Sequence, residues 1–216
     1  MAKINHAVSF LLYHRIEVDF PKSTFWAHLE LLKHKKKIIS YDEAIKTLSS
    51  RRVIPEDLYV LTFDDGYQDL YTVGFPVLKN LNLPAIVFIP TGFIENSGPI
   101  NNLPKSIPLS WKMLKEMSES GLLTIGSHTH MHLELPKETK DTIIAELKRP
   151  IDILRENLGK EVKHFAYPRA IWDKKVELLV KRFYETAALV GLKRMTTKNF
   201  NPYRIIRRPV IIKVFR

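Results

Sequence analysis

Short apolar runs rich in β-branched residues alternate along the chain with longer amphipathic segments. This alternation is typical of repeated βα units, in which helices cover a parallel sheet. The predicted strands are Val8–Tyr13, Ile38–Ile39, Tyr59–Phe63, Ala85–Ile89, Leu122–Ile125, His164–Tyr167, Glu185–Leu189 and either Ile205–Ile206 or Val210–Val214. The predicted helices are Thr24–Lys35, Asp42–Ser49, Gly74–Asn80, Trp111–Ser120, Lys140–Leu158 and Asp173–Phe183. The pattern therefore predicts an α/β fold built on parallel strands.

Local signals support several of these boundaries. Ser23 and Ser110 stand before predicted helices as N-caps, and Gly121 and Gly159 follow helix ends. The segment Glu95–Ser110 is rich in proline, glycine and asparagine and shows neither a helical nor a strand period. Loops of this length are usually functional lids or disordered segments. We weigh a substrate-facing loop equally against a plain surface excursion.

Composition indicates an ordinary globular protein. The 216 residues suit one domain spanning 1–216, with 45% hydrophobic and 26% charged residues. No apolar run approaches the roughly 18 residues that cross a bilayer. The apolar stretch Ala7–Tyr13 runs directly into His14 and Arg15 without a small-residue cleavage site. We therefore expect a cytoplasmic protein, although a shortened form of an exported protein would have the same sequence.

Two further features of the composition restrict the chemistry. The chain has no cysteine, so a bound metal would rest on histidine, aspartate or glutamate. The formal net charge of +11 could attract nucleic acid, an anionic membrane or an acidic glycan. The basic residues are spread along the chain, and no base-stacking aromatic series accompanies them. We therefore expect a basic solvated surface and no nucleic-acid partner, with the oligomeric state undetermined.

Three polar clusters each follow a predicted strand. They are Asp64-Asp65-Gly66, Gly126–His132 and Pro168-Arg169. The carboxyl ends of parallel strands meet on one face of a βα fold, where sites are built. This placement predicts that the three clusters share one functional site.

The aspartate pair and the histidines favour a metal. Two adjacent carboxylates at a buried strand end repel each other unless a cation or donors offset them. The alternative is that one of them only caps the Asp-Gly turn. His128, His130 and His132 lie within five residues, and two imidazoles with one carboxylate leave coordination positions open. Spacing alone does not decide which two histidines bind, because 128 and 132 share a helical face whereas all three share an extended one.

The motifs resemble those of the polysaccharide deacetylases, the NodB-homology enzymes of carbohydrate esterase family 4. Leu61–Gly66 resembles their first motif, Ser127–His132 their second, and Phe165–Pro168 the third motif of the branch acting on poly-N-acetylglucosamine. Leu12–Ile16 and Arg204–Val210 also fit that branch, so the resemblance covers nearly the whole chain in order.

The resemblance implies a distorted (β/α) barrel of about seven strands, a NodB-like fold, and hydrolysis of an N-acetyl group on a glycan or amino sugar. It implies that Asp65, His128 and His132 ligate one divalent metal, most often zinc, with nickel, cobalt or iron also suited. Asp64 would be the general base, and the backbone N–H of Arg169 would stabilise the oxyanion.

The chain departs from the family pattern in three places. The arginine that usually opens the third motif is missing from Ala166–Arg169, and Arg207 is the best substitute, with Arg208 second. The residues after the proline also differ, which affects the pocket wall. No histidine follows His164, so the usual late histidine that acts as general acid is absent. His14 directly follows the first strand, on the face of the three clusters, and we expect it to be the general acid.

Two other functions stay open. A His-x-His pair that includes His130 would suit another metal-dependent amidohydrolase or a phosphoesterase, with further ligands at strand ends. A catalytically inactive, basic, glycan-binding barrel would keep the motifs passively and bind without turnover.

Overall fold

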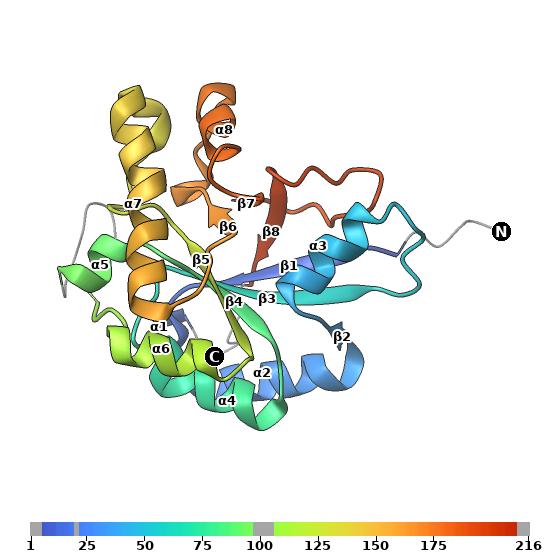
Figure 1. Ribbon diagram of the computed structural model, residues 1–216. Helices are drawn as coiled ribbons and strands as arrows, with labels where there is room; N and C mark the ends of the chain where they lie inside the picture. Colours follow the sequence, from blue (N-terminus) through green and yellow to red (C-terminus); the bar gives the residue numbers. More distant parts are fainter. Residues whose placement is uncertain (1–5, 20–21, 97–105, 211–216) are drawn as a thin grey trace.

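Parallel strands and outer helices form a closed barrel in the computed structural model, which describes residues 6–19, 22–96 and 106–210 (Figure 1). The strands are β1 Val8–Tyr13, β2 Lys37–Ile38, β3 Leu58–Asp64, β4 Ala85–Ile89, β5 Leu123–Ser127, β6 His164–Ala166, β7 Thr186–Val190 and β8 Ile205–Pro209. The α-helices are α1 Ile16–Asp19, α2 Lys22–Lys35, α3 Tyr41–Ser49, α4 Phe75–Leu81, α5 Thr91–Glu95, α6 Trp111–Glu119, α7 Lys140–Leu158 and α8 Lys174–Val180. Shorter helical turns are η1 Leu70–Gly74, η2 Leu135–Lys137 and η3 Pro168–Ala170.

The barrel closes because β1 pairs with strands on both of its edges. It pairs in parallel with β3 from Val8 to Tyr13, and with β8 on the other side. The remaining neighbours follow in the order β3, β4, β5, β6, β7, β8, all parallel. The two-residue strand β2 pairs with the beginning of β3 and lies outside this ring. Seven strands thus form the barrel, which confirms the predicted NodB-like (β/α) architecture.

Alternation along the strands decides which residues face the barrel interior. Alternate positions of β1, β3, β4, β6, β7 and β8 form one buried apolar cluster, which includes Phe10, Val60, Phe88 and Ile205. On β3 the same face continues through Thr62 to Asp64, and on β8 it continues from Ile205 to Arg207. The interior therefore changes from apolar to charged toward the carboxyl ends of the strands.

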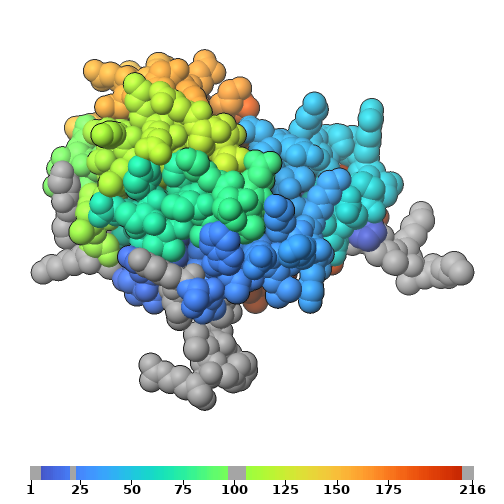
Figure 2. Space-filling view, turned by 90° about the horizontal axis from the view of Figure 1, so that it is seen from below, coloured from blue at the N-terminus to red at the C-terminus, as the bar shows by residue number. Residues whose placement is uncertain are grey.

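The helices pack outside the ring and bury the other face of each strand. Side by side, α2, α4 and α6 cover one flank, and α7 and α8 lie together on another (Figures 1 and 2). N-caps begin several of them: the Ser110 side chain accepts from Met113 N–H at the start of α6, and Gly159 ends α7 in the left-handed conformation. Leu147 and Leu154 of α7 contribute to the buried cluster between helices and sheet.

Most predicted elements are present, with local differences. The N-cap prediction for Ser23 is wrong, because α2 already begins at Lys22. Of the two possible last strands, Ile205–Ile206 is the start of β8, whereas 211–214 of the other lie outside the described residues. The predicted loop Glu95–Ser110 also lies largely outside them, at 97–105. Among the described helices, none combines the length and apolar character that a bilayer crossing requires.

Candidate active site at the carboxyl ends of the strands

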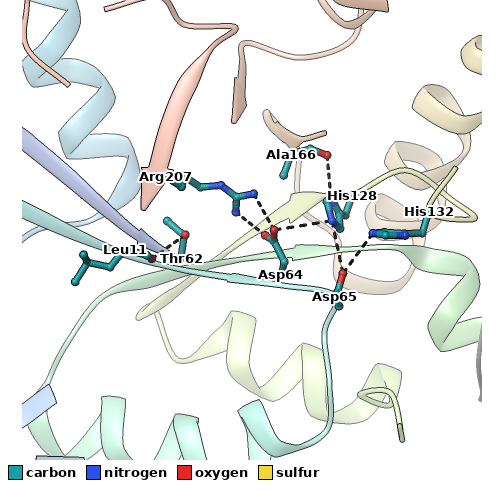
Figure 3. A network of polar contacts seen from close by, with 8 residues as sticks. All are labelled: Leu11, Thr62, Asp64, Asp65, His128, His132, Ala166 and Arg207. Atoms are coloured by element: carbon teal, nitrogen blue, oxygen red, sulfur yellow. Dashed lines mark hydrogen bonds and ion pairs between the residues drawn. The ribbon is translucent and has the colours of Figure 1, made fainter. Parts of the chain in front are cut away.

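The turns after β1, β3, β5 and β6 surround a pocket of about 360 Å³. Its lining includes six of the residues singled out in the sequence, namely His14, Asp64, Asp65, His128, His132 and Arg169. Arg207 reaches Asp64 from inside the barrel (Figure 3). Sequence reasoning assigned no role to other lining residues such as Asp19, Tyr67 and Val190, because pocket walls depend on how distant turns meet.

Asp65, His128 and His132 place three ligand atoms together. Asp65 Oδ1 lies 3.6 Å from His128 Nε2 and 3.7 Å from His132 Nε2, and all three residues are buried (Figure 3). Tetrahedral ligation at bonds near 2.1 Å would separate ligand atoms by about 3.4 Å. The three atoms therefore have the donor types and the spacing of a metal site with open positions.

Hydrogen bonding and burial prepare both imidazoles for this role. His128 Nδ1 donates to the carbonyl of Ala166 at 2.8 Å, which fixes the tautomer and turns Nε2 toward Asp65. Burial lowers the pKa of His128, and burial is also the main cause that lowers the pKa of His132 to about 3. Both rings are thus neutral, as metal ligation requires.

The two aspartates of the first motif lie in different environments. Burial would raise the pKa of Asp64, but Arg207 and His128 outweigh it and hold the pKa at about 2. Arg207 NH1 and NH2 contact the two Asp64 oxygens at 2.5 and 2.8 Å, a bidentate pair that fixes the carboxylate (Figure 3). The Arg207 side chain is fully buried and its guanidinium lies 4.9 Å from the Phe88 ring centre. Asp64 is therefore ionised and immobilised.

Among the described residues, Asp65 has no such bidentate arginine partner. Burial and the charge of Asp64 raise the pKa of Asp65 to about 7, although a hydrogen bond from Tyr67 and the charges of Arg207 and Arg15 act in the opposite direction. A buried carboxylate beside another negative charge is costly unless a cation offsets it. The donor set and this only partly compensated carboxylate both fit a divalent metal at Asp65.

Backbone strain concentrates at the same turns. Seven described residues other than glycine have a positive φ, and five of them lie in the three motif turns: Asp65, Thr129, His132, Arg169 and Ala170. Such conformations cost on the order of 1–3 kcal/mol each and gather at functional sites. Gly66 also has a positive φ, of 70°, and an added Cβ would lie 2.6 Å from Ile89 Cδ1, so any other residue there would be strained and would displace the Ile89 side chain.

His14 and Arg169 both border the pocket, at the ends of different strands. His14 follows β1 directly, and Arg169 lies in η3 after β6. The Arg169 side chain extends to Glu134 at 3.5 Å, while its backbone has a φ of 55°. Both residues thus line the same 360 Å³ cavity as Asp65, His128 and His132.

His130 points elsewhere. Its Nδ1 is 2.8 Å from Thr91 Oγ1, and its Nε2 is 3.8 Å from Glu95. His130 is absent from both the pocket lining and the ligand group found among the described residues. The geometry therefore pairs His128 with His132.

Comparison with known proteins identifies the family. Residues 51–187 match the family model described as polysaccharide deacetylase. The chain belongs to the polysaccharide deacetylase family. The chain is 29% identical over 195 residues to the poly-beta-1,6-N-acetyl-D-glucosamine N-deacetylase of Staphylococcus aureus strain MRSA252, covering 86% of this chain and 66% of that protein. It is 31% identical over 193 residues to the protein of the same name from Staphylococcus epidermidis, covering 85% and 65%. The chain thus spans just under two thirds of the length of these relatives.

Solved structures show the same fold. The Streptococcus pyogenes deacetylase PplD, determined in complex with acetate, superposes with a TM-score of 0.82 at 23% identity, covering 96% of this chain and 94% of that one. IcaB from Ammonifex degensii superposes with a TM-score of 0.80 at 23% identity, covering 97% and 93%.

Proposed function

We propose that this deacetylase hydrolyses N-acetyl groups on a glycan, using one divalent metal ion held by Asp65, His128 and His132 in a single catalytic domain. The observation that carries the proposal is the set of three ligand atoms within 4.8 Å of one another, beside the ionised carboxylate of Asp64. Zinc suits two imidazoles and one carboxylate best, and nickel, cobalt or iron are also compatible. When bound, the ion supplies Lewis-acid activation of the acetyl carbonyl and of water.

Asp64 acts as the general base. Water forms a bond to the acetyl carbon while Asp64 accepts the proton that the water loses, and the C–N bond then breaks to give acetate and a free amine. The bidentate contact with Arg207 keeps the Asp64 carboxylate oriented and ionised. Its low pKa makes it a weak base, so its effect rests on position rather than on basicity.

Arg169 and His14 assist at the other atoms of the amide. The backbone N–H of Arg169 donates to the oxygen on which negative charge develops, a role supported by its place in the pocket wall. His14 donates a proton to the leaving nitrogen, which is otherwise expelled as a poor anion. Its place in the lining of the same pocket supports this assignment, because a protonated imidazole there can donate to a leaving amine.

A second pocket supports a substrate longer than one sugar. It has a volume of about 180 Å³, shares Arg15 and Tyr67 with the catalytic pocket, and continues to Ile107. Val18 and Ile107 on its wall are 62% and 68% exposed. The lining combines the apolar surfaces of Val18, Tyr67 and Ile107 with polar and charged side chains, which could contact both the faces and the hydroxyls of a sugar ring. The substrate class is therefore an oligomer or polymer of N-acetylated units, in line with the names of the staphylococcal relatives.

The proposal is tested by product analysis over matched substrates. Purified protein is incubated with N-acetylglucosamine and with its β-1,4- and β-1,6-linked oligomers, and acetate and primary amine are both quantified. Equimolar acetate and amine, released faster from oligomers than from the monomer, is the expected result. Binding of oligomers without acetate release would instead favour the inactive glycan-binding barrel.

A pair of variants tests the second pocket. Ile107→Ser should slow oligomers while leaving monomer hydrolysis unchanged, because Ile107 lies away from the metal ligands. Leu178→Ser, at a 65% exposed position of α8, is the matched control. Equal slowing of monomer and oligomers by Ile107→Ser would contradict a role in holding the neighbouring sugar.

The His-x-His alternative has no specific observation in its favour. The His130 ring hydrogen-bonds Thr91 and faces Glu95, and it is not part of the ligand group Asp65, His128 and His132. Hydrolysis of a phosphate monoester such as p-nitrophenyl phosphate would support the phosphoesterase alternative.

A further inference from the structure

The loop that carries both metal-ligating histidines contains strained backbone. Between His128 and His132 the chain makes a tight turn in which Thr129 has a φ of 65° and His132 itself has a φ of 55°. Non-glycine residues in this region cost on the order of 1–3 kcal/mol each, and they persist only where surrounding contacts enforce them. A relaxed loop would move His132 away from His128, so something outside the loop holds it.

Glu146 of α7 makes such contacts. Its Oε2 accepts the backbone N–H of His130 at 3.1 Å and that of Met131 at 2.8 Å, so one carboxylate oxygen holds the two consecutive peptide groups before His132. Glu146 is 5% exposed, and it forms no ion pair with a basic side chain within the described ranges. Burial raises the pKa of Glu146.

A buried carboxylate without a cation is expensive to keep in a helix–sheet core. On the same face of α7, the neighbouring buried positions Ile143, Leu147 and Leu154 are apolar. Hydrogen bonds from two backbone donors to a charged acceptor are strong, and they offset part of this cost. The arrangement therefore stabilises this particular loop conformation rather than the core in general.

The adjacent residue of α7 holds the other end of the loop. Tyr184 OH lies 2.6 Å from the Leu147 carbonyl and 2.8 Å from Ser127 Oγ. Because a carbonyl only accepts, the Tyr184 proton goes to Leu147 and the Ser127 hydroxyl donates to Tyr184. Ser127 directly precedes His128, so one turn of α7 is tied to the loop just before His128, through Tyr184, and again at His130 and Met131, through Glu146.

We propose that Glu146 is a positioning residue of the metal site, which holds the His128–His132 loop in its strained ligating form. The proposal rests on the proposed metal site. Glu146 is not part of the pocket lining, so it acts through the loop and not on substrate.

The test measures zinc affinity and does not use turnover. Zn²⁺ is titrated into metal-free wild-type protein and into Glu146→Ala, Glu146→Asp and Glu146→Gln, in competition with a chromophoric chelator. Far-UV circular dichroism and thermal unfolding are recorded with and without Zn²⁺. Glu156→Ala, an exposed position of the same helix, is the control.

Glu146→Ala and Glu146→Asp should weaken zinc binding by roughly 10–100-fold, as loss of other outer contacts to metal ligands does. Aspartate keeps the charge but is too short to reach both N–H groups. Glutamine keeps the length and an accepting oxygen, so Glu146→Gln should stay within a few-fold of wild type, as should Glu156→Ala. Near-normal zinc affinity in Glu146→Gln with weak affinity in Glu146→Asp would show that the length of the side chain matters. Its charge and a general loss of stability would not explain that pattern.

A purely structural role gives a different pattern. The proposal is overturned if Glu146→Asp folds and binds zinc with wild-type affinity, even if its melting temperature is lower. If Glu146→Ala does not fold, the test relies on Glu146→Asp. Wild-type protein that binds zinc as described but releases no acetate from any glycan defeats the proposed function and leaves the role of Glu146 standing. Wild-type protein that binds no divalent ion overturns both.

Discussion

The two ends of the barrel use the same residue types in opposite ways. At the carboxyl ends of the strands, buried His132 has no partner for Nδ1 within the described residues, and burial together with the charge of Asp64 raises the pKa of Asp65 to about 7. At the other end, buried His164 begins β6 and both its ring nitrogens are paired, with Thr186 Oγ1 and Asp42 Oδ1 at 2.9 Å each.

The backbone shows the same contrast. Five strained residues lie in the pocket turns, whereas the other two positive-φ residues outside glycine, Arg51 and Asn82, lie just after helices α3 and α4. Helices commonly end in this conformation. At the amino end, the fully paired ring of His164 helps to hold the fold together, whereas the unpaired Nδ1 of His132 and the backbone strain mark the end with the candidate site. The variants below test this division.

Asp64→Asn should have the largest effect. We expect turnover to fall by about 10²–10⁴-fold, because the amide cannot accept the proton that general base catalysis transfers. Metal content, measured by elemental analysis, should stay near that of wild type. Asp42→Asn at the opposite end of the barrel is the control and should keep its turnover. Loss of metal along with activity in Asp64→Asn would make Asp64 a ligand instead.

His14→Ala should have the second-largest effect. We expect turnover to fall by roughly 10²-fold, the lower end of general acid–base effects. The leaving amine would then depend on water for its proton, so the basic limb of the pH–rate profile should flatten. Metal content should not change. His34→Ala, an exposed histidine of α2, serves as control. A near-normal rate and an unchanged pH profile would return the general acid to another residue or to water.

Arg207→Lys should produce a smaller defect, roughly 10-fold in turnover, near the lower end of losses seen for groups that orient an active residue. Lysine keeps the positive charge but loses the fork that contacts both oxygens of Asp64. Arg208→Ala removes the exposed neighbour and should be silent. Wild-type turnover in Arg207→Lys would show that the positive charge alone is enough and that the two-oxygen contact does not orient Asp64.

His164→Leu should leave turnover per folded molecule unchanged while lowering stability. Thr186 and Asp42 lose their shared partner, and an unsatisfied buried group costs about 1–3 kcal/mol. The measurement is denaturant unfolding together with acetate release. A selective loss of turnover at full stability would show that the two ends are not separate in function.

The pH dependence of stability sharpens the same comparison. The hydrogen bond from His164 is the main cause that lowers the pKa of Asp42. A carboxylate whose pKa is lower in the folded state stabilises the fold above its unfolded-state pKa. This stabilisation is lost as pH falls through the folded-state pKa. Wild type should therefore lose stability between these two pKa values more steeply than His164→Leu. If the free energy of unfolding varied with pH in the same way in both proteins, the contact between His164 and Asp42 would make no contribution to stability.

Much of the fold follows from local sequence. Val8–Tyr13, Ala85–Ile89 and Lys140–Leu158 have the predicted boundaries, because apolar runs and caps act over a few residues. Ser23 was assigned as a cap from its residue type alone, although α2 starts one residue earlier. The end of β5 extends to Ser127, since the motif residues pair with β4 and β6 before the chain turns.

The site was predictable to the extent that strand ends mark it. Placement after strands was enough to suggest that Asp64, Asp65 and the histidines meet, but only the fold separates His130 from His132. Glu146 was missed because a glutamate in an amphipathic helix is usually exposed. Its position three residues after buried Ile143 and next to Leu147 was a signal that it lies on the apolar face.

The central claim is that one divalent ion at Asp65, His128 and His132 supports removal of acetyl groups. It is tested most directly by stripping the protein with a chelator and measuring acetate release from an N-acetylglucosamine oligomer while Zn²⁺ is titrated back. We expect activity to be lost on stripping and to recover fully at one ion per chain. Acetate release that persists in the stripped protein, or recovery only at two ions per chain, would contradict the claim.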